Sequence, residues 1–134
     1  MIIEQYYNSD PGYKPILIRD GWQVGHLNFM PELRPEAIDR LERHKQTDEV
    51  FILFKGSASL VAAIETPAGL KWETHRMGAG VTYNVPAVLW HTIAMTPEDL
   101  VLIVEKNNTH LNDVEYRKLT DAERRSLQEI LNKE

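Results

Sequence analysis

The sequence predicts an all-β protein, either a sandwich or a closed barrel of short strands. Apolar or alternating runs recur along the chain, and they are rich in β-branched and aromatic residues. Turn-forming pairs such as Asp20-Gly21 and Lys55-Gly56 separate these runs. Many short strands at this spacing favour a sandwich or barrel over a parallel α/β sheet.

Eight strands are predicted, and together they place the core of the barrel at about residues 15–106. In chain order they span residues 15–19, 22–29, 50–55, 57–64, 70–75, 81–85, 92–95 and 100–105.

Two segments depart from the β pattern. Segment 35–41 begins with Pro35, a favoured first helical residue, and spaces its apolar residues three apart, which predicts a short helix. Thr120 is followed three residues later by Glu123, a capping-box pattern, and an apolar stripe at helical spacing comes next. We therefore expect a C-terminal helix at about residues 121–132, packed on the outside of the barrel.

The composition excludes several classes of protein. A length of 134 residues matches one domain spanning 1–134. A formal net charge of -5 argues against a nucleic-acid partner, because phosphate binding requires clustered Lys and Arg. There is no cysteine, so any metal must use nitrogen and oxygen ligands. The first residues show no basic segment followed by an apolar run, and no apolar run approaches about 18 residues, so we expect a cytoplasmic protein without a membrane partner.

Residues 42–56 carry ligand-type side chains beside a turn. His44 precedes Glu49 by five residues, and Gly56 follows at the end of a predicted strand. This pattern resembles the first motif of the cupin superfamily, in which two histidines one residue apart precede a glutamate and then a glycine. Glu42 stands where the family has the first of those histidines.

A second segment combines turn residues with a histidine. Gly80 is followed by Pro86 six residues later and by His91 five residues beyond that, which resembles the second cupin motif. Val88 stands where that motif usually has glycine. The resemblance covers residues 42–95 and implies a cupin double-stranded β-helix, a jelly-roll barrel. It also implies a homodimer, in which the N-terminal strands pair with a second chain.

The resemblance implies a metal site with nitrogen and oxygen ligands. The ligands it assigns are His44, Glu49 and His91, with Glu42 or Gln46 in place of the missing histidine. Such a set accepts iron, manganese, nickel or zinc. The first two ligands are five residues apart, the wrong parity for one strand, so residues 47–48 must turn or bulge if both are to face one cavity.

Four further side chains are predicted to line a ligand cavity at the barrel mouth. They are His26, Tyr83, Trp90 and Met95. The tyrosine is a candidate proton donor, in the role that a tyrosine has in cupin-type sugar epimerases. His75 and His110 are expected at the surface, because they lie near turns and polar connections.

Two functions remain open at this point. The preferred one is a small-molecule-binding cupin with a metal in the barrel mouth, acting as a sugar-type isomerase, an epimerase or a dioxygenase. The alternative is a metal-free domain that binds or senses a carbohydrate or another metabolite without catalysis. The reaction types follow from fold resemblance alone, and one fold hosts many functions.

Overall fold

The computed structural model describes residues 2–134. Within this range the chain forms ten strands, two 3-10 turns and two α-helices. The strands are β1 (Gly12–Arg19), β2 (Trp22–Asn28), β3 (Arg40–Arg43), β4 (Glu49–Lys55), β5 (Ser59–Thr66), β6 (Gly69–Arg76), β7 (Thr82–Val85), β8 (Trp90–Ala94), β9 (Leu100–Glu105) and β10 (Glu115–Lys118). The helical elements are the 3-10 turns Pro31–Leu33 and Pro35–Ala37, with α1 (Thr109–Asn112) and α2 (Asp121–Asn132).

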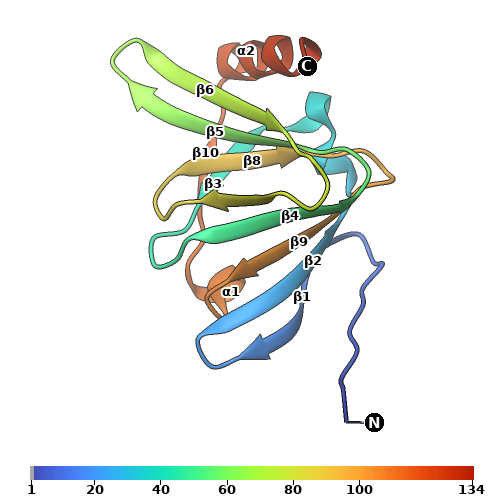
Figure 1. Cartoon of the computed structure of the whole chain (residues 1–134). Coiled ribbons are helices and arrows are strands. Elements are labelled where there is room, and N and C mark those ends of the chain that lie inside the picture. The colour runs from blue at the N-terminus through green and yellow to red at the C-terminus, as the bar shows by residue number, and fades with distance from the viewer. Residues whose placement is uncertain (1) are drawn as a thin grey trace.

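The strands form two five-stranded sheets. The first sheet has the order β1-β2-β9-β4-β7, and the second has the order β10-β3-β8-β5-β6. Each pair of neighbouring strands is antiparallel. Figure 1 shows the two sheets with α2 beside β6, at the opposite end of the molecule from the N-terminus. The all-β prediction is confirmed, and the architecture is a jelly roll.

All eight predicted strands are present, with ends shifted by up to three residues. The predicted helix at 35–41 is wrong beyond its first turn. A 3-10 turn ends at Ala37, and the chain then becomes extended and forms β3 from Arg40. Ile38 and Leu41 are buried against the second sheet and α2, so their spacing reflects two contacts with one core rather than a helical face.

Two short strands, β3 and β10, were not predicted from the sequence. β3 and β10 have four residues each and pair with one another, and β3 also pairs with β8. Each of these strands has a single apolar residue, Leu41 or Tyr116, so no alternation of apolar and polar residues is visible in the sequence. The connection 107–113 contains the single turn α1.

The C-terminal helix forms where its capping pattern predicts. The Thr120 hydroxyl oxygen accepts a hydrogen bond from the Glu123 backbone N–H at 3.1 Å, and the Thr120 N–H donates to Glu123 Oε1 at 2.9 Å. Leu127 and Leu131 are buried. The helix therefore covers apolar residues of the second sheet. Neither this helix nor any other between residues 2 and 134 is long and apolar enough to cross a membrane.

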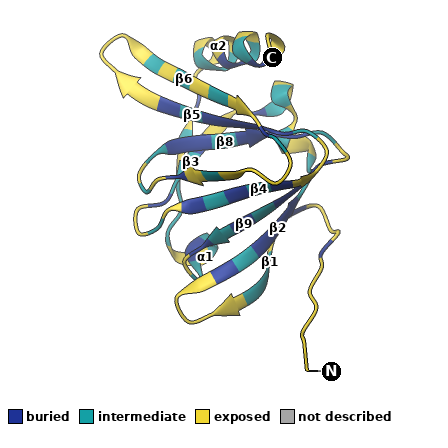
Figure 2. Cartoon of the chain, viewed as in Figure 1, coloured by how far each residue is buried: buried dark blue, intermediate teal, exposed yellow. Residues whose placement is uncertain are grey.

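Two apolar clusters lie on the two faces of the second sheet. Figure 2 shows β8 and the first half of β5 largely buried, whereas β6 at the edge of this sheet is largely exposed. The inner cluster combines residues of both sheets, including Phe51, Ile93 and Ile103. The outer cluster lies between the second sheet and α2, and it includes Trp90 and Leu127. Consecutive strand residues point to opposite faces, so β8 contributes Ile93 to the inner cluster and Trp90 to the outer one.

Candidate metal centre

Four ionisable residues from three strand regions meet at one end of the space between the sheets. Glu42 on β3 is the register partner of His91 on β8, in the second sheet. His44 follows the end of β3, and Glu49 begins β4 in the first sheet. The expectation that the chain turns between His44 and Glu49 is met, because residues 44–48 lie outside the strands and carry the chain from one sheet to the other.

The centre of the cluster is one carboxylate oxygen. Glu49 Oε1 lies 3.1 Å from His44 Nε2 and 2.8 Å from His91 Nε2. Glu42 Oε1 lies 3.9 Å from His91 Nε2. One ligand atom from each of the four residues lies within 4.8 Å of the others. His44, Glu49 and His91 are at most 5% exposed, whereas Glu42 is half-buried.

Backbone carbonyls orient both imidazoles. His44 Nδ1 lies 2.6 Å from the carbonyl oxygen of Asp113, and His91 Nδ1 lies 2.9 Å from that of Leu89. A carbonyl oxygen only accepts hydrogen bonds, so each Nδ1 carries the proton. Each Nε2 is therefore turned toward Glu49, and this is how neighbouring groups commonly orient metal-binding histidines.

The Glu49 carboxylate and the two imidazoles stabilise one another's charged forms and so shift one another's pKa values. Burial alone would raise the pKa of Glu49, but hydrogen bonds and charge interactions with both imidazoles lower it to about 2. Burial alone would lower the pKa of His44, yet its hydrogen bond to Glu49 and that carboxylate's charge raise it to about 9. The pKa of His91 is raised for the same reason. Burial and the negative charge of Glu49 raise the pKa of Glu42.

The donor set fits a divalent metal ion. With metal–ligand bonds of about 2.1 Å, two ligands at right angles are about 3 Å apart. The two contacts of Glu49 Oε1 with the imidazoles, at 3.1 and 2.8 Å, match that spacing. Two imidazoles and two carboxylates also suit iron, manganese, nickel or zinc.

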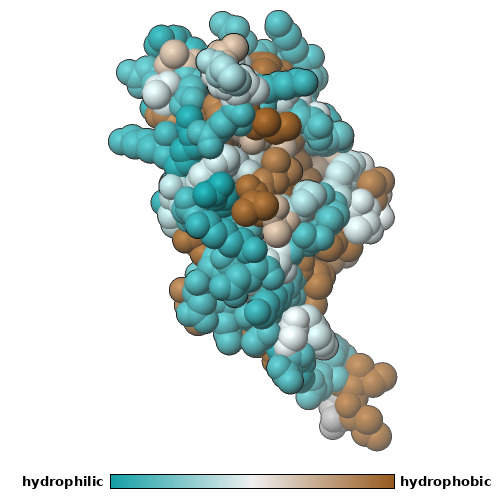
Figure 3. All heavy atoms as spheres, turned by 90° about the vertical axis from the view of Figure 1, so that its left-hand side faces the viewer, coloured by the Kyte–Doolittle hydropathy of each residue, from teal (hydrophilic) through white to brown (hydrophobic). Residues whose placement is uncertain are grey.

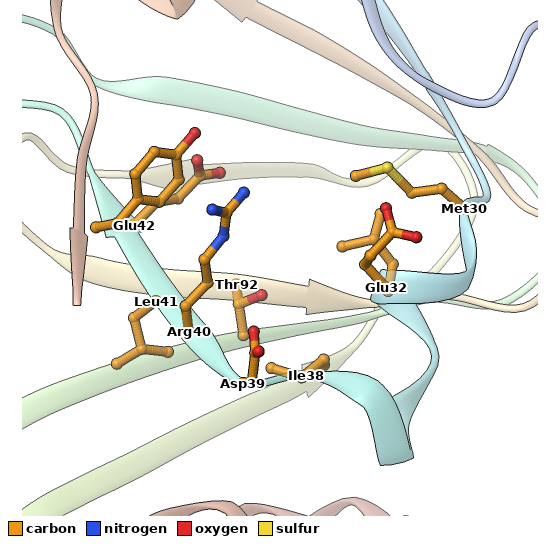
Figure 4. Close-up of a pocket in the computed structure, with 10 residues that line it drawn as sticks. Met30, Glu32, Ile38, Asp39, Arg40, Leu41, Glu42 and Thr92 are labelled. Atoms are coloured by element: carbon orange, nitrogen blue, oxygen red, sulfur yellow. The ribbon is translucent and has the colours of Figure 1, made fainter. Parts of the chain in front are cut away.

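The cluster lies in the wall of a cavity of about 190 Å³. Leu27, Phe51 and Ile103 give this inner cavity apolar walls. A second cavity of about 380 Å³ lies next to it and shares Arg40 and Glu42 with it. Figure 4 shows Arg40 extending into this outer cavity between Glu42 and Glu32. The guanidinium carbon of Arg40 lies 3.9 Å from the centroid of the Tyr116 ring.

Gln46, the other proposed fourth ligand, does not join the cluster. It is exposed and does not line the inner cavity. The Asp113 carboxylate accepts hydrogen bonds from the backbone N–H groups of Lys45 and Gln46 at 2.9 and 2.8 Å. This bends the chain after His44, so the alternation that relates residues 42, 44 and 46 on a strand ends there. Glu42 occupies the fourth position instead.

The four predicted cavity residues also lie outside the inner cavity. Trp90 faces the outer cluster, because it is adjacent to His91 on β8 and points to the opposite face. Met95 is buried in the inner apolar cluster. The Tyr83 hydroxyl accepts a hydrogen bond from the Gly78 N–H at 2.9 Å. His26 Nδ1 accepts a weak hydrogen bond from the Asn8 N–H at 3.4 Å.

The prediction for His26 is wrong, because His26 lies on the face of β2 that points away from the inner cavity. The inward residues of β2 are Gln23, Gly25 and Leu27, whereas His26 packs edge-on against Tyr7. The expectation for His75 holds, since it is exposed.

His110 differs from expectation, since it is half-buried and lines the inner cavity. Sequence reasoning also missed a polar group in the cavity wall: Tyr13 and Glu105, with Gln23 behind them. One signal was available for Glu105. It ends the apolar strand 100–105 with the same parity as Ile103, so it points inward. Tyr13 and Gln23 are brought next to Glu105 by the pairing of β1, β2 and β9, and the sequence does not show which strands pair.

The structure is similar to solved cupin structures. A cupin-2 domain protein from Shewanella frigidimarina matches with a TM-score of 0.53 and 18% identity, covering 75% of this chain and 85% of that one. KdgF from Halomonas sp. matches with a TM-score of 0.54 and 17% identity, covering 78% and 87%. An RmlC-like cupin with a double-stranded β-helix from Methanocaldococcus jannaschii matches with a TM-score of 0.53 and 17% identity, covering 80% and 92%.

The protein thus has the fold of the cupin superfamily, as the two sequence motifs predicted. No protein-family model matches the sequence, and the curated proteins contain no significant match either. The comparisons therefore show the fold alone.

Proposed function

We propose that the protein binds one divalent metal ion through Glu42, His44, Glu49 and His91 and uses it to act on a small polar metabolite in the inner cavity. One observation carries this proposal. A single buried carboxylate oxygen contacts two Nε2 atoms at ligand spacing, while both Nδ1 atoms are held by backbone carbonyls.

The chain itself supplies orientation and shielding. The carbonyl groups of Asp113 and Leu89 hold the imidazoles, and the apolar walls keep bulk water away from the ligand. A bound ion supplies Lewis acidity, since it polarises a substrate oxygen or lowers the pKa of water. The reaction classes we propose are isomerisation or epimerisation of a sugar-type metabolite and oxygen-dependent cleavage. Oxygen consumption by the metal-loaded protein separates the last of these from the others.

Metal analysis tests the proposal. Protein purified without a chelator or a metal-affinity tag is expected to contain one equivalent of iron, manganese, nickel or zinc. A His44→Ala, His91→Ala double variant is expected to fold and to lose the metal. His75→Ala is a matched control, because His75 is exposed. Absence of metal from every preparation, with no thermal shift on adding any of the four ions, would contradict the proposal.

A second candidate is a metal-free domain that binds a carbohydrate or another metabolite. It is supported by the ion pair between Glu49 and His44, because this pair neutralises the two buried charges without a metal ion. Under this alternative the metal-free protein binds its ligand with undiminished affinity after dialysis against a chelator.

We also propose that the protein is a homodimer. The N-terminal segment extends away from the sheets and its end is apolar (Figure 3), with Ile2 and Ile3 among the most exposed side chains. Such exposed apolar surface commonly marks an interface. Light scattering is expected to give twice the chain mass for the full protein and the chain mass after deletion of residues 1–7.

A further inference from the structure

A buried glutamate in the inner cavity has one oxygen that is hydrogen-bonded and one that is not. Glu105 Oε2 lies 2.8 Å from the Tyr13 hydroxyl and 3.2 Å from Gln23 Nε2, and both groups donate to it. Glu105 Oε1 is buried and has no hydrogen-bond partner among residues 2–134. It lies 3.9 Å from His44 Nε2.

The groups around Glu105 fix which oxygen faces the cavity. Gln23 is fully buried, and its Oε1 accepts from the Asn108 N–H at 2.8 Å, which leaves its Nε2 to donate to Glu105 and to the Tyr13 oxygen at 3.1 Å. The Tyr13 ring reaches this place because residue 25 is glycine. A Cβ there would lie 2.1 Å from the ring. The lone pairs of Glu105 Oε1 are thereby left for a group in the cavity.

An acceptor of this kind is costly unless something binds it. Leaving a buried carboxylate oxygen unpaired costs more than a hydrogen bond contributes, so such atoms in native proteins call for a partner. The side chain is 2% exposed, so it does not reach bulk solvent. A ligand bound in the inner cavity is in a position to be the hydrogen-bond partner of Glu105 Oε1.

The cavity limits the size and charge of that ligand. A volume of about 190 Å³ corresponds to about six water molecules at about 30 Å³ each. A ligand ammonium group at this position would lie close to the proposed divalent ion, which repels a positive charge. A neutral hydroxyl donates a hydrogen bond without that repulsion.

We infer that Glu105 determines the specificity of the site by accepting, through Oε1, a hydrogen bond from a hydroxyl group of a ligand with about six to eight non-hydrogen atoms. This inference rests on the proposed metal function. It assigns to the site a small hydroxylated compound, such as a short hydroxy acid or polyol, with one oxygen directed to the metal and a hydroxyl directed to Glu105.

The test compares two probes that differ in one hydrogen-bond donor. Lactate carries a hydroxyl, and 2-methoxypropanoate has an ether oxygen in its place. Calorimetric titration of the manganese-loaded protein is carried out at pH 8, because burial and the charge of Glu49 raise the pKa of Glu105 to about 7. It is expected to show at least tenfold tighter binding of lactate, since a hydrogen bond to a charged group is among the stronger ones. Coordination of the metal by the lactate hydroxyl also favours lactate, and it does so in every variant. The quantity to compare between variants is therefore the ratio of the affinity for lactate to that for 2-methoxypropanoate.

Glu105→Gln reverses the polarity of the free atom while keeping its shape. The amide oxygen retains the hydrogen bonds from Tyr13 and Gln23, and the amide nitrogen, a donor, replaces Oε1. The ratio of the two affinities is expected to fall about tenfold. Glu129→Gln makes the same chemical change on the exposed face of α2 and is expected to keep the wild-type ratio.

The outcomes separate the two proposals. If wild-type protein binds no metal, the proposed function fails. If it binds manganese but not lactate, or if metal-loaded Glu105→Gln keeps the wild-type ratio, the inference about Glu105 is overturned. Should Glu105→Gln not fold, Glu105→Leu combined with Tyr13→Phe provides the test, because it removes the acceptor together with the hydroxyl that donates to it and must also lower the ratio.

Discussion

Two adjacent residues of β8, His91 and Trp90, show how differently the two faces of one sheet are used. His91 faces the inner cavity, where it contacts the carboxylate of Glu49. Trp90 faces α2, donates a hydrogen bond from Nε1 to Glu65 at 3.2 Å and lies under the Arg43 guanidinium at 4.2 Å. The inner side holds the buried charges that we propose to bind a metal ion, whereas the outer side holds apolar packing against α2. Changing one side should therefore leave the other largely intact.

The largest effect is expected at the inner side, from Glu49→Gln. The neutral amide is a poor ligand and the carboxylate is central, so metal affinity should fall more than about a hundredfold, beyond the loss typical of a supporting residue. Glu73→Gln changes the exposed Glu73–His75 pair and is the matched control. Metal content and a competition titration measure the effect. Stoichiometric metal in folded Glu49→Gln would disprove the role of this carboxylate.

At the outer side, Leu127→Ala is expected to lower the free energy of unfolding by about 2–5 kcal/mol, because it leaves a cavity beneath α2. Leu111→Ala, at a leucine that is 71% exposed, should change it by less than about 0.5 kcal/mol. Urea denaturation gives both values. Metal affinity should be unchanged in folded Leu127→Ala, and a loss of metal there would show that the two faces are coupled.

The pH dependence follows from the charges of the inner side. The folded state raises the pKa of His44 from 6.5 to about 9, so stability is present below pH 6.5 and is lost as the pH rises toward 9. Glu105 acts in the same direction at lower pH, because burial and the charge of Glu49 raise its pKa from 4.5 to about 7. The melting temperature of metal-free protein should fall by several degrees from pH 6.5 to 9.

The metal-loaded protein should behave differently, because its ligands are deprotonated imidazoles and metal affinity rises with pH. Its melting temperature is expected to change less than that of the metal-free protein over the same range. An equal decline in both forms, measured by differential scanning calorimetry, would argue against metal ligation by His44.

The smallest effect is expected at the turn before β8. Val88 has a φ of 65°, in the left-handed region that a β-branched residue adopts only with strain. Val88→Gly removes this strain and should raise the free energy of unfolding by about 1 kcal/mol, measured by urea denaturation. Val81→Gly is the control at an exposed valine with ordinary φ and should not stabilise the protein. Destabilisation by Val88→Gly would show that the turn tolerates valine without cost.

The fold and the ligand cluster were largely predictable from local patterns. The eight predicted strands and α2 carry periods, turns and a capping box that are visible within a few residues. The metal-type residues stand at motif spacings, so the sequence alone indicates Glu42, His44, Glu49 and His91 as candidate ligands. Gln46 fits the same pattern, because nothing local indicates that the Asp113 carboxylate bends the chain there.

What the residue order determined by itself was a β-rich chain with a capped final helix and four ligand-type side chains at motif spacing, because these properties depend on neighbours a few positions apart. Only the tertiary structure decided on which face of a sheet each side chain lies and which other side chains it contacts. Tyr13 and Glu105 are 92 positions apart and share a hydrogen bond. Such contacts arise from strand pairing and sheet register, which depend on the packing of the whole molecule.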